Sequence, residues 1–279
     1  MRHITEAEIA AFEEYLIGEE RARATVAKYL RDVRDFYEWI GDGDVCKVAL
    51  VAYKEALCDR YAPASVNAAI SSLNGFFRFL EWHDLRVKSL RIQRQIFAAE
   101  EKELSRGEYE RLLEAAGKRG NERLCLLMQT ICSTGIRVSE VQDITVSAVE
   151  RGYAEINCKG KRRRVLLPKR LCSALRSYAR KRKIKGGAVF VTRNGNPLDR
   201  SNIWSEMKQL CRAAGVSAAK VFPHNLRHLF ARTYYSAQKD IVRLADLLGH
   251  SSVNTTRIYT METGEVHRRQ IQELGLLRC

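Results

Sequence analysis

The sequence predicts a mainly α-helical protein that carries a small antiparallel β-sheet. Apolar residues recur every three to four positions through most of the chain, which is the period of an amphipathic helix. One stretch, RGYAEINCKGKRRRVLLP at 151–168, instead has two strand-like runs around a basic turn, the pattern of a hairpin. Two capping boxes, Thr5 with Glu8 and Ser105 with Glu108, begin helices in separate parts of the chain.

The first third is expected to form a compact four-helix bundle, a domain over residues 1–86. Its second helix carries Val26, Leu30 and Val33 on one stripe and stops near Gly41. The helical segments are TEAEIAAFEEYL, ATVAKYLRDVRDFYEWIG, VALVAYKEALCDRY and, after Pro63, SVNAAISSLNGFFRFLEWH.

A charged, weakly periodic stretch at 87–102 is the expected linker, and residues 103–279 form the expected second domain. There, NERLCLLMQTICSTG predicts an apolar helix that ends at Gly135. AVFVTRNGNPL, residues 188–198, suggests a further strand and turn, and the remaining segments have helical patterns.

Charge is distributed unevenly between the two parts. The 279 residues are 46% hydrophobic, enough for a sizeable core, and carry a net charge of +15. Residues 1–94 contain 14 Lys and Arg against 15 Asp and Glu, whereas residues 95–279 contain 34 against 18. A basic balance points to a polyanion, either nucleic acid or an anionic membrane surface, and its one-sided placement favours nucleic acid.

The cysteines and the N-terminal stretch argue against several classes of protein. The eight cysteines show neither a CxxC pair nor the Cys/His spacing of a metal site, so they fit small core residues of a reduced protein. MRHITEAEIA lacks the pattern of a signal peptide, and no apolar run approaches the ~18 residues of a membrane span. The expectation is a cytoplasmic protein with no metal and no membrane partner.

Short motifs in the second part place cationic side chains at helix starts. In STGIRVSEV, Gly135 ends one helix and Arg137 stands near the start of the next, where backbone N–H groups and a guanidinium can face one anion. In FPHNLRHLFA, Pro223 suits a first helical turn, and His224 and Arg227 share a face that can present a donor and a fork to a phosphate. Taken singly, the first motif fits a surface arginine at a helix start better than an anion site, and the second fits an ordinary basic helix equally well.

The predicted hairpin and the C-terminal stretch add further candidates. Lys159 stands where the first strand meets the turn, from which a lysine can reach into a DNA groove and donate a proton to a leaving oxygen. In LLGHSSVNTTRIYT, Tyr259 follows His250 and is either a half-buried aromatic or a nucleophile. A basic run that fits a solvated, phosphate-clamping turn follows Lys159: Lys161, Arg162, Arg163 and Arg164.

Together these residues form a set suited to phosphate chemistry. Displacement at a phosphodiester creates a phosphorane with extra negative charge, which two guanidinium groups could meet. The sequence has no Walker A loop, no HExxH motif and no convincing carboxylate set for two Mg²⁺, so no cofactor is expected. A phenol is a poor nucleophile because its ordinary pKa is about 10, and nearby cations and a histidine would ease its deprotonation. A phosphotyrosine would store the bond energy, so resealing would need no ATP.

In these motifs the chain resembles the tyrosine recombinases of the phage integrase family, especially the short two-domain Xer-type and transposon-encoded members. TGIRVSE, CKGKRRRVLLP, HNLRH and LLGHSSVNTTRIYT match in order and spacing over the second domain, and the helical first third matches more loosely. The resemblance implies an N-terminal four-helix SAM-like core-binding domain and a C-terminal tyrosine recombinase catalytic domain, which together form a C-shaped clamp on DNA.

The resemblance also implies a role for each residue. Tyr259 would attack the scissile phosphate, giving a 3′-phosphotyrosyl link and a free 5′-hydroxyl. Arg137 and Arg227 would hold the non-bridging oxygens. Lys159 would be the general acid for the leaving 5′-oxygen, with Lys161 as the alternative because loop lengths in this hairpin vary.

Two histidines and a carboxylate complete the implied site. His224 and His250 would hydrogen-bond the phosphate and assist proton transfer, and Glu140 would orient an active-site partner. The near-neutral N-terminal domain would contact DNA through a local basic stripe: Lys28, Arg31 and Arg34.

The implied partners are double-stranded DNA with paired inverted-repeat sites and further copies of the chain, because the family works as a tetramer on two synapsed sites. VHRRQIQELGLL, residues 266–277, would dock on a neighbour or pack in cis. An arm-binding domain is not expected before residue 5, and we therefore expect a simple recombinase acting on short inverted repeats.

Two other functions remain alternatives. A type IB topoisomerase shares the nucleophile and much of the catalytic set, but the length and the helical bundle favour a recombinase. A non-catalytic DNA-binding regulator could keep the fold, but the complete set of six primary site residues speaks against it. Integration, excision, inversion and resolution use the same strand exchange, so the sequence does not choose among them.

Overall fold

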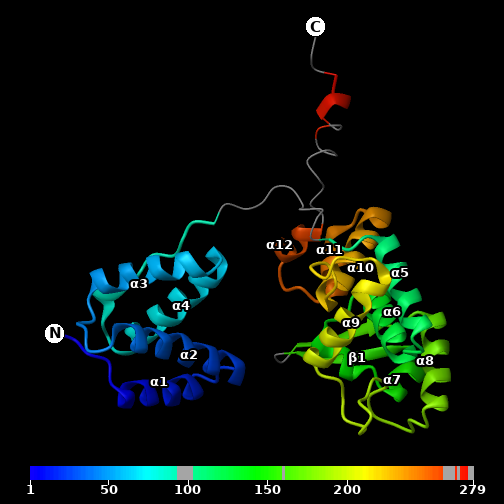
Figure 1. Cartoon of the computed structure of the whole chain (residues 1–279), viewed down its shortest axis with the longest axis horizontal. Helices are drawn as coiled ribbons and strands as arrows, with labels where there is room; N and C mark the ends of the chain where they lie inside the picture. The colour runs from blue at the N-terminus through cyan, green and yellow to red at the C-terminus, as the bar shows by residue number, and fades with distance from the viewer. Residues whose placement is uncertain (93–102, 159–160, 260–267, 269–270, 276–279) are drawn as a thin grey trace. The chain divides into compact units, whose positions relative to one another are not determined.

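The computed structural model describes residues 1–92, 103–158, 161–259, 268 and 271–275. The chain divides into two compact units, Met1–Arg94 and Gln95–Cys279 (Figure 1). Both are mainly helical, and the sheet found among the described residues has two antiparallel strands. The predicted fold class is therefore confirmed.

The first unit is a bundle of four α-helices around an aromatic core. Phe12, Phe36 and Phe76 are at most 1% exposed, and the rings of Phe12 and Phe76 meet edge to face at 5.1 Å. The predicted capping box begins the first helix, since the Glu8 N–H donates to Thr5 Oγ1 at 3.2 Å and the Thr5 N–H donates to the Glu8 carboxylate at 2.8 Å. The elements are α1 (Glu6–Gly18), α2 (Arg23–Ile40), α3 (Lys47–Arg60), α4 (Pro63–Phe79) and the 3₁₀ turn η1 (His83–Leu85).

The start of the predicted linker, 87–102, packs on the first unit. Val87 is buried, and its backbone N–H and carbonyl both pair with the side-chain amide of Asn74 at 2.9 Å. The Leu90 backbone pairs in the same way with Asn67. Both asparagines lie on α4, so two side-chain amides hold this segment against the bundle.

The second unit is a larger helical body with the hairpin at one side (Figure 1). Its first helix begins with the predicted Ser105–Glu108 capping box, and α6 ends at Gly135 in the left-handed conformation, as expected. The helical elements are α5 (Arg106–Lys118), α6 (Glu122–Thr134), η3 (Val138–Asp143), α7 (Val146–Arg151), α8 (Lys169–Lys181), α9 (Arg200–Ala214), α10 (Pro223–Gln238), α11 (Ile241–Leu248), α12 (Val253–Thr256) and η4 (Arg257–Tyr259).

The predicted hairpin is present. Strand β1 (Tyr153–Cys158) pairs antiparallel with β2 (Lys161–Leu166), from the pair of Tyr153 with Leu166 to that of Cys158 with Lys161. The turn residues 159–160 lie outside the described part of the chain, so the position predicted for Lys159 is not placed.

The further strand expected in residues 188–198 does not form, although the turn does. Ala188 and Val191 make only isolated bridges, the second of them to Pro197. Proline has no backbone N–H to donate, so a ladder cannot grow from this pair. Gly195, with a φ of +81°, closes the turn.

Two expectations concern the cysteines and the membrane. Cys46, Cys58, Cys125, Cys132, Cys172 and Cys211 are free thiols. Across the described ranges, no helix combines the length and apolarity that crossing a membrane requires.

Candidate active site

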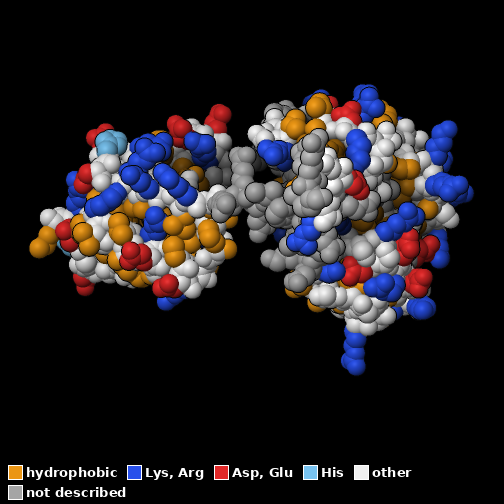
Figure 2. All heavy atoms as spheres, turned by 90° about the horizontal axis from the view of Figure 1, so that it is seen from above, with side chains coloured by type: hydrophobic (Ala, Val, Ile, Leu, Met, Phe, Trp, Pro, Cys, Tyr) orange, Lys and Arg blue, Asp and Glu red, His pale blue; other side chains and the backbone are white. Residues whose placement is uncertain are grey.

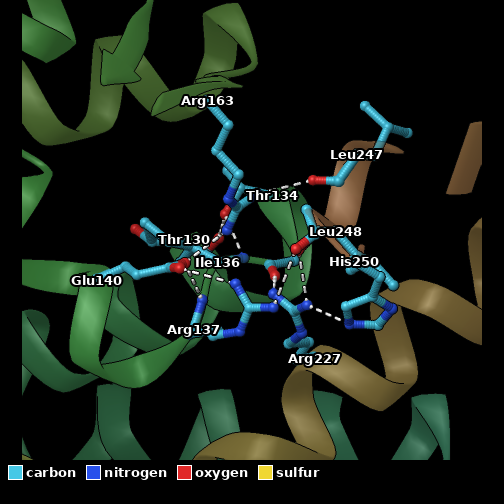
Figure 3. A network of polar contacts seen from close by, with 12 residues as sticks. Thr130, Thr134, Ile136, Arg137, Glu140, Arg163, Arg227, Leu247, Leu248 and His250 are labelled. Carbon is cyan, nitrogen blue, oxygen red and sulfur yellow. Dashed lines mark hydrogen bonds and ion pairs between the residues drawn. The ribbon is translucent and has the colours of Figure 1, made fainter. Parts of the chain in front are cut away.

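Arg227 on α10 lies at the centre of the candidate site and is only 2% exposed. Its Nη1 donates to the Gly135 carbonyl at 2.5 Å, and its Nη2 donates to the Leu248 carbonyl and to His250 Nε2, each at 2.9 Å (Figure 3). Burial lowers the pKa of Arg227, as does the charge of Arg137, while an interaction with Tyr259 opposes the shift. A buried cation is therefore held by neutral acceptors.

Arg137 stands directly before η3, close to Arg227, and is one-third exposed on its side chain. Its Nη1 donates to Glu140 Oε1, and its backbone N–H donates to Glu140 Oε2, both at 2.9 Å. Burial raises the pKa of the Glu140 carboxyl, but the hydrogen bonds from Arg137 and the charge of Arg163 outweigh it, so the net pKa is lowered. Glu140 is thus an anion, only 5% exposed, that orients Arg137.

The C-terminal end of α11 holds three arginines from three different elements. Three consecutive carbonyl oxygens there each accept a hydrogen bond from a different guanidinium group, and the C-terminus of a helix favours positive charge. The pairs are Leu247 with Arg163 at 2.9 Å, Leu248 with Arg227 at 2.9 Å and Gly249 with Arg137 at 3.3 Å.

Positive charge exceeds negative charge in this cluster. Among the described residues, Glu140 forms ion pairs with two of the three guanidinium groups, those of Arg137 and Arg163. Three cations and one anion leave an excess of two positive charges, and the side chain of Arg137 is one-third exposed. The arrangement suits a phosphate, whose two non-bridging oxygens can each accept from a guanidinium fork.

His250 follows the carbonyl triplet and is held on both ring nitrogens. Since an arginine only donates, His250 Nε2 accepts from Arg227, and Nδ1–H therefore donates to the buried Thr256 Oγ1 at 2.9 Å. Burial, followed by the charges of Arg227 and Arg137, lowers the pKa of His250 to about 4. His250 is neutral at pH 7 in the DNA-free chain.

Tyr259 lies beside these residues and is 3% exposed. Its ring is nearly parallel to that of His250, with centroids 6.0 Å apart, and meets the ring of His228 edge to face at 4.7 Å. His228 in turn meets His224 at 4.5 Å. Burial lowers the pKa of His224, and that of His228 to about 4, so the two imidazoles that meet the tyrosine ring, those of His228 and His250, are neutral at pH 7.

The structure thus brings together five of the six predicted primary residues, Arg137, His224, Arg227, His250 and Tyr259, whereas Lys159 lies outside the described residues. The predicted partner Glu140 is also in place. Among the described residues, no group of three or more His, Cys, Asp or Glu side chains is arranged to hold a metal ion.

Arg163 departs from the prediction of a solvated, DNA-facing turn. Its side chain is 16% exposed because it turns inward, where Glu140 and the Leu247 carbonyl accept its hydrogen bonds. Its neighbours Arg162 and Arg164 remain exposed, and Arg164 stacks on Tyr153 at 4.9 Å.

The predicted basic stripe on α2 is also only partly realised. Lys28 donates to Asp32 at 2.5 Å and to Ser72 at 3.1 Å, so its ammonium belongs to an internal network rather than to an open DNA face. Arg31 and Arg34 are exposed. Figure 2 shows Lys and Arg side chains mixed with acidic ones on the visible surface of both units.

Sequence patterns do not reveal three contributors to the site. Nothing in the basic run distinguishes Arg163 from its neighbours, and Thr256 lies within a polar stretch. Gly249 has a φ of +65°, and a Cβ there would lie 2.4 Å from the Arg163 Cδ atom. The glycine directly before His250 is the one signal that could point to this close approach.

Comparisons with known proteins agree with this geometry. Residues 102–265 match the phage integrase family, and residues 9–84 match the N-terminal SAM-like domain of phage integrases. Tyrosine recombinase XerA of Thermococcus kodakarensis is 33% identical to this chain in an alignment 279 residues long. The alignment covers 96% of this chain and 95% of XerA.

Two solved structures share the fold. XerH site-specific recombinase bound to its difH substrate has a TM-score of 0.70 at 20% identity, covering 95% of this chain and 84% of XerH. A lambda integrase tetramer bound to a Holliday junction has a TM-score of 0.72 at 20% identity, covering 91% and 76% of the two chains. With the match over most of the second unit and the similarity to XerA along nearly the whole chain, this protein belongs to the phage integrase family and is a tyrosine recombinase, an enzyme of site-specific DNA recombination.

Proposed function

We propose that the chain cleaves and rejoins double-stranded DNA through a covalent 3′-phosphotyrosyl intermediate on Tyr259, without a metal or ATP. The observation that carries this proposal is the cluster of three guanidinium groups with one carboxylate, next to a buried tyrosine. A buried cation that lacks an anion is costly, so the cluster is suited to a ligand that brings negative charge.

In the first step, the Tyr259 oxygen attacks the phosphorus of the scissile phosphate. The bond from phosphorus to the 5′-oxygen breaks, and the 3′-phosphate stays on the tyrosine. Arg227 and Arg137 exchange their carbonyl partners for the two non-bridging oxygens, where negative charge grows in the transition state. Attack by a 5′-hydroxyl on the phosphotyrosine reverses the step and reseals a strand.

Two proton transfers accompany the reaction. Lys159 is proposed to protonate the leaving 5′-oxygen. The phosphate raises the pKa of His224 and His250 by its negative charge, so that each can hydrogen-bond an oxygen and the pair can receive the tyrosine's proton. In the DNA-free chain both are instead kept neutral by burial and by the arginines.

The proposed partners are DNA with paired inverted repeats and other copies of the chain, acting in the cytoplasm. The related XerH is bound to a difH DNA substrate, and the related lambda integrase is a tetramer on a Holliday junction. We further propose that residues 1–86 form the core-binding domain and residues 103–279 the catalytic domain. Arg31, Arg34, Arg162 and Arg164 are exposed and offer cations to DNA phosphates.

The test has two stages. The variant Tyr259→Phe retains the cluster of arginines but lacks the nucleophile, and it is used to isolate the DNA site that the protein binds from a library of random duplexes. The selected site is then rebuilt with a nick beside the scissile phosphate, so that the short 5′-hydroxyl fragment diffuses away and a covalent complex accumulates. The wild type should form this complex, and Tyr259→Phe should bind equally well without forming it.

Tyr234→Phe is the matched control, because Tyr234 packs against the same small apolar cluster as Tyr259. It should form the complex normally. A wild type that forms no covalent complex with its selected site would refute the mechanism. Relaxation of plasmids that lack the site would indicate a type IB topoisomerase instead.

A further inference from the structure

Arg163 is a partly buried arginine that the proposed mechanism does not use. It lies on β2, and its side chain crosses to two other elements of the second unit (Figure 3). Its Nη1 donates to the Leu247 carbonyl at the end of α11 at 2.9 Å, and its Nη2 donates to Glu140 Oε2 on η3 at 2.6 Å. One guanidinium therefore connects the strand, the 3₁₀ turn before which Arg137 stands, and the helix end that precedes His250.

The fit of this side chain is close. Gly249 leaves just enough room for it: a Cβ at that position would lie 2.4 Å from Cδ and 2.7 Å from Nε of Arg163. Real contacts of a Cβ are essentially never shorter than 3.0 Å, so only glycine permits this path. The site is built so that Arg163 passes against the backbone directly before His250.

Arg163 also shares the charge of Glu140. The Oε1 atom accepts from Arg137 Nη1, whereas Oε2 accepts from Arg163 Nη2 and from the Arg137 backbone N–H. Without Arg163, Arg137 would be the one guanidinium paired with this buried carboxylate. A tighter pair with Glu140 would neutralise Arg137 and direct its fork away from a phosphate.

We propose that Arg163 is a positioning residue for strand cleavage. Its guanidinium group holds Glu140 and the end of α11 at a fixed distance from each other and partly neutralises the carboxylate. Arg137 and Arg227 therefore stay directed at the phosphate. Arg163 itself does not touch the phosphate. The inference rests on the proposed function, since it concerns the rate of the same cleavage step.

The test compares Arg163→Met, Glu140→Gln and the double variant in single-turnover cleavage of the nicked substrate at saturating enzyme. Misdirected catalytic groups commonly slow a reaction by about 100-fold, and a loss of this order is expected for Arg163→Met. Adding Glu140→Gln to Arg163→Met removes the negative charge that neutralises Arg137. The double variant should therefore cleave faster than Arg163→Met alone. A rate for Arg163→Met close to that of the wild type, or a double variant no faster than Arg163→Met, would overturn the proposal.

A second readout separates positioning from a loss of packing. A methylphosphonate replaces one non-bridging oxygen of the scissile phosphate with a methyl group and so removes the negative charge that the arginines meet. If Arg163 works through Arg137, the ratio of wild-type to Arg163→Met rates should be smaller on this substrate than on the phosphate. An unchanged ratio would show that Arg163 has a structural role alone.

The controls address folding and net charge. Arg180→Met removes an exposed arginine on α8 and should cleave at the wild-type rate. Thermal unfolding shows whether each variant is folded at the assay temperature. Arg163→Lys replaces the methionine variant if that does not fold, and it should cleave more slowly than the wild type. If the wild type forms no covalent complex, both the proposed function and this inference are refuted. If the wild type forms the complex and Arg163→Met cleaves at the wild-type rate, the inference alone is refuted.

Discussion

The two units treat buried charge in opposite ways. In the first unit, Asp32 is 7% exposed, and its carboxylate is met by the ammonium of Lys28, the hydroxyl of Ser72 and the exposed guanidinium of Arg31, so the buried anion has partners of opposite charge. In the second unit, Arg227 is more deeply buried and has neutral acceptors. A network in which each buried charge has a partner of opposite sign stabilises the fold, whereas a network with an excess of one charge favours binding of a ligand with the opposite charge.

The largest expected effect is at the unbalanced cation. Arg227→Lys keeps a positive charge but lacks the fork, so it cannot hold the Gly135 carbonyl with one nitrogen while a second nitrogen exchanges the Leu248 carbonyl for a phosphate oxygen. Loss of a donor aimed at transition-state charge typically costs about 10²- to 10³-fold in rate. Single-turnover cleavage of the nicked substrate measures it, and a loss of less than tenfold would show that the buried cation is structural, like the network around Asp32.

The next effect is a loss of stability at Gly249. Gly249→Ala places a Cβ against Arg163 and keeps a φ of +65°, so we expect about 2–3 kcal/mol of destabilisation from strain and displaced contacts. Gly215→Ala is the matched control, because Gly215 also caps a helix in the left-handed conformation but has no described neighbour within 4 Å of the position that a Cβ would take. Chemical denaturation of both variants measures the difference, and equal losses would mean that Arg163 moves aside freely.

This contrast also shows what sequence reasoning could reach. His224 and Arg227 are predictable because residues three apart on one helix share a face. Gly135 is predictable as a helix end because it closes an apolar helical pattern. The inward path of Arg163 is not predictable, because it depends on a glycine 86 positions later in the chain, and local periodicity carries no information about such a contact.

The balanced network provides a smaller prediction. Asp32→Asn leaves the partly buried ammonium of Lys28 with neutral partners, and we expect about 1–2 kcal/mol of destabilisation, within the range for removing one hydrogen-bond partner of a buried group. Denaturation followed by tryptophan fluorescence in a Trp204→Phe background measures it, because Trp39 and Trp82, the remaining tryptophans, both lie in the first unit. An unchanged free energy of unfolding would mean that water replaces Asp32 as the partner of Lys28. The first unit would then tolerate an unpaired buried charge as well as the second unit does.

The smallest effect is the pH dependence of the DNA-free chain. In the folded chain, the pKa values of His250 and His228 are lowered to about 4, mainly by burial. Between about pH 4 and the ordinary histidine pKa of about 6.5, these two side chains are therefore protonated in the unfolded chain but neutral in the folded chain. Stability should therefore fall as the pH drops from about 6.5 toward 4 and be independent of these groups above that window. His250→Gln should reduce the fall measured by thermal unfolding, whereas His3→Gln, at an exposed position, should not. Because a bound phosphate favours protonated imidazoles, site DNA should weaken the dependence, and an equal fall with and without DNA would mean that the histidines do not sense the phosphate.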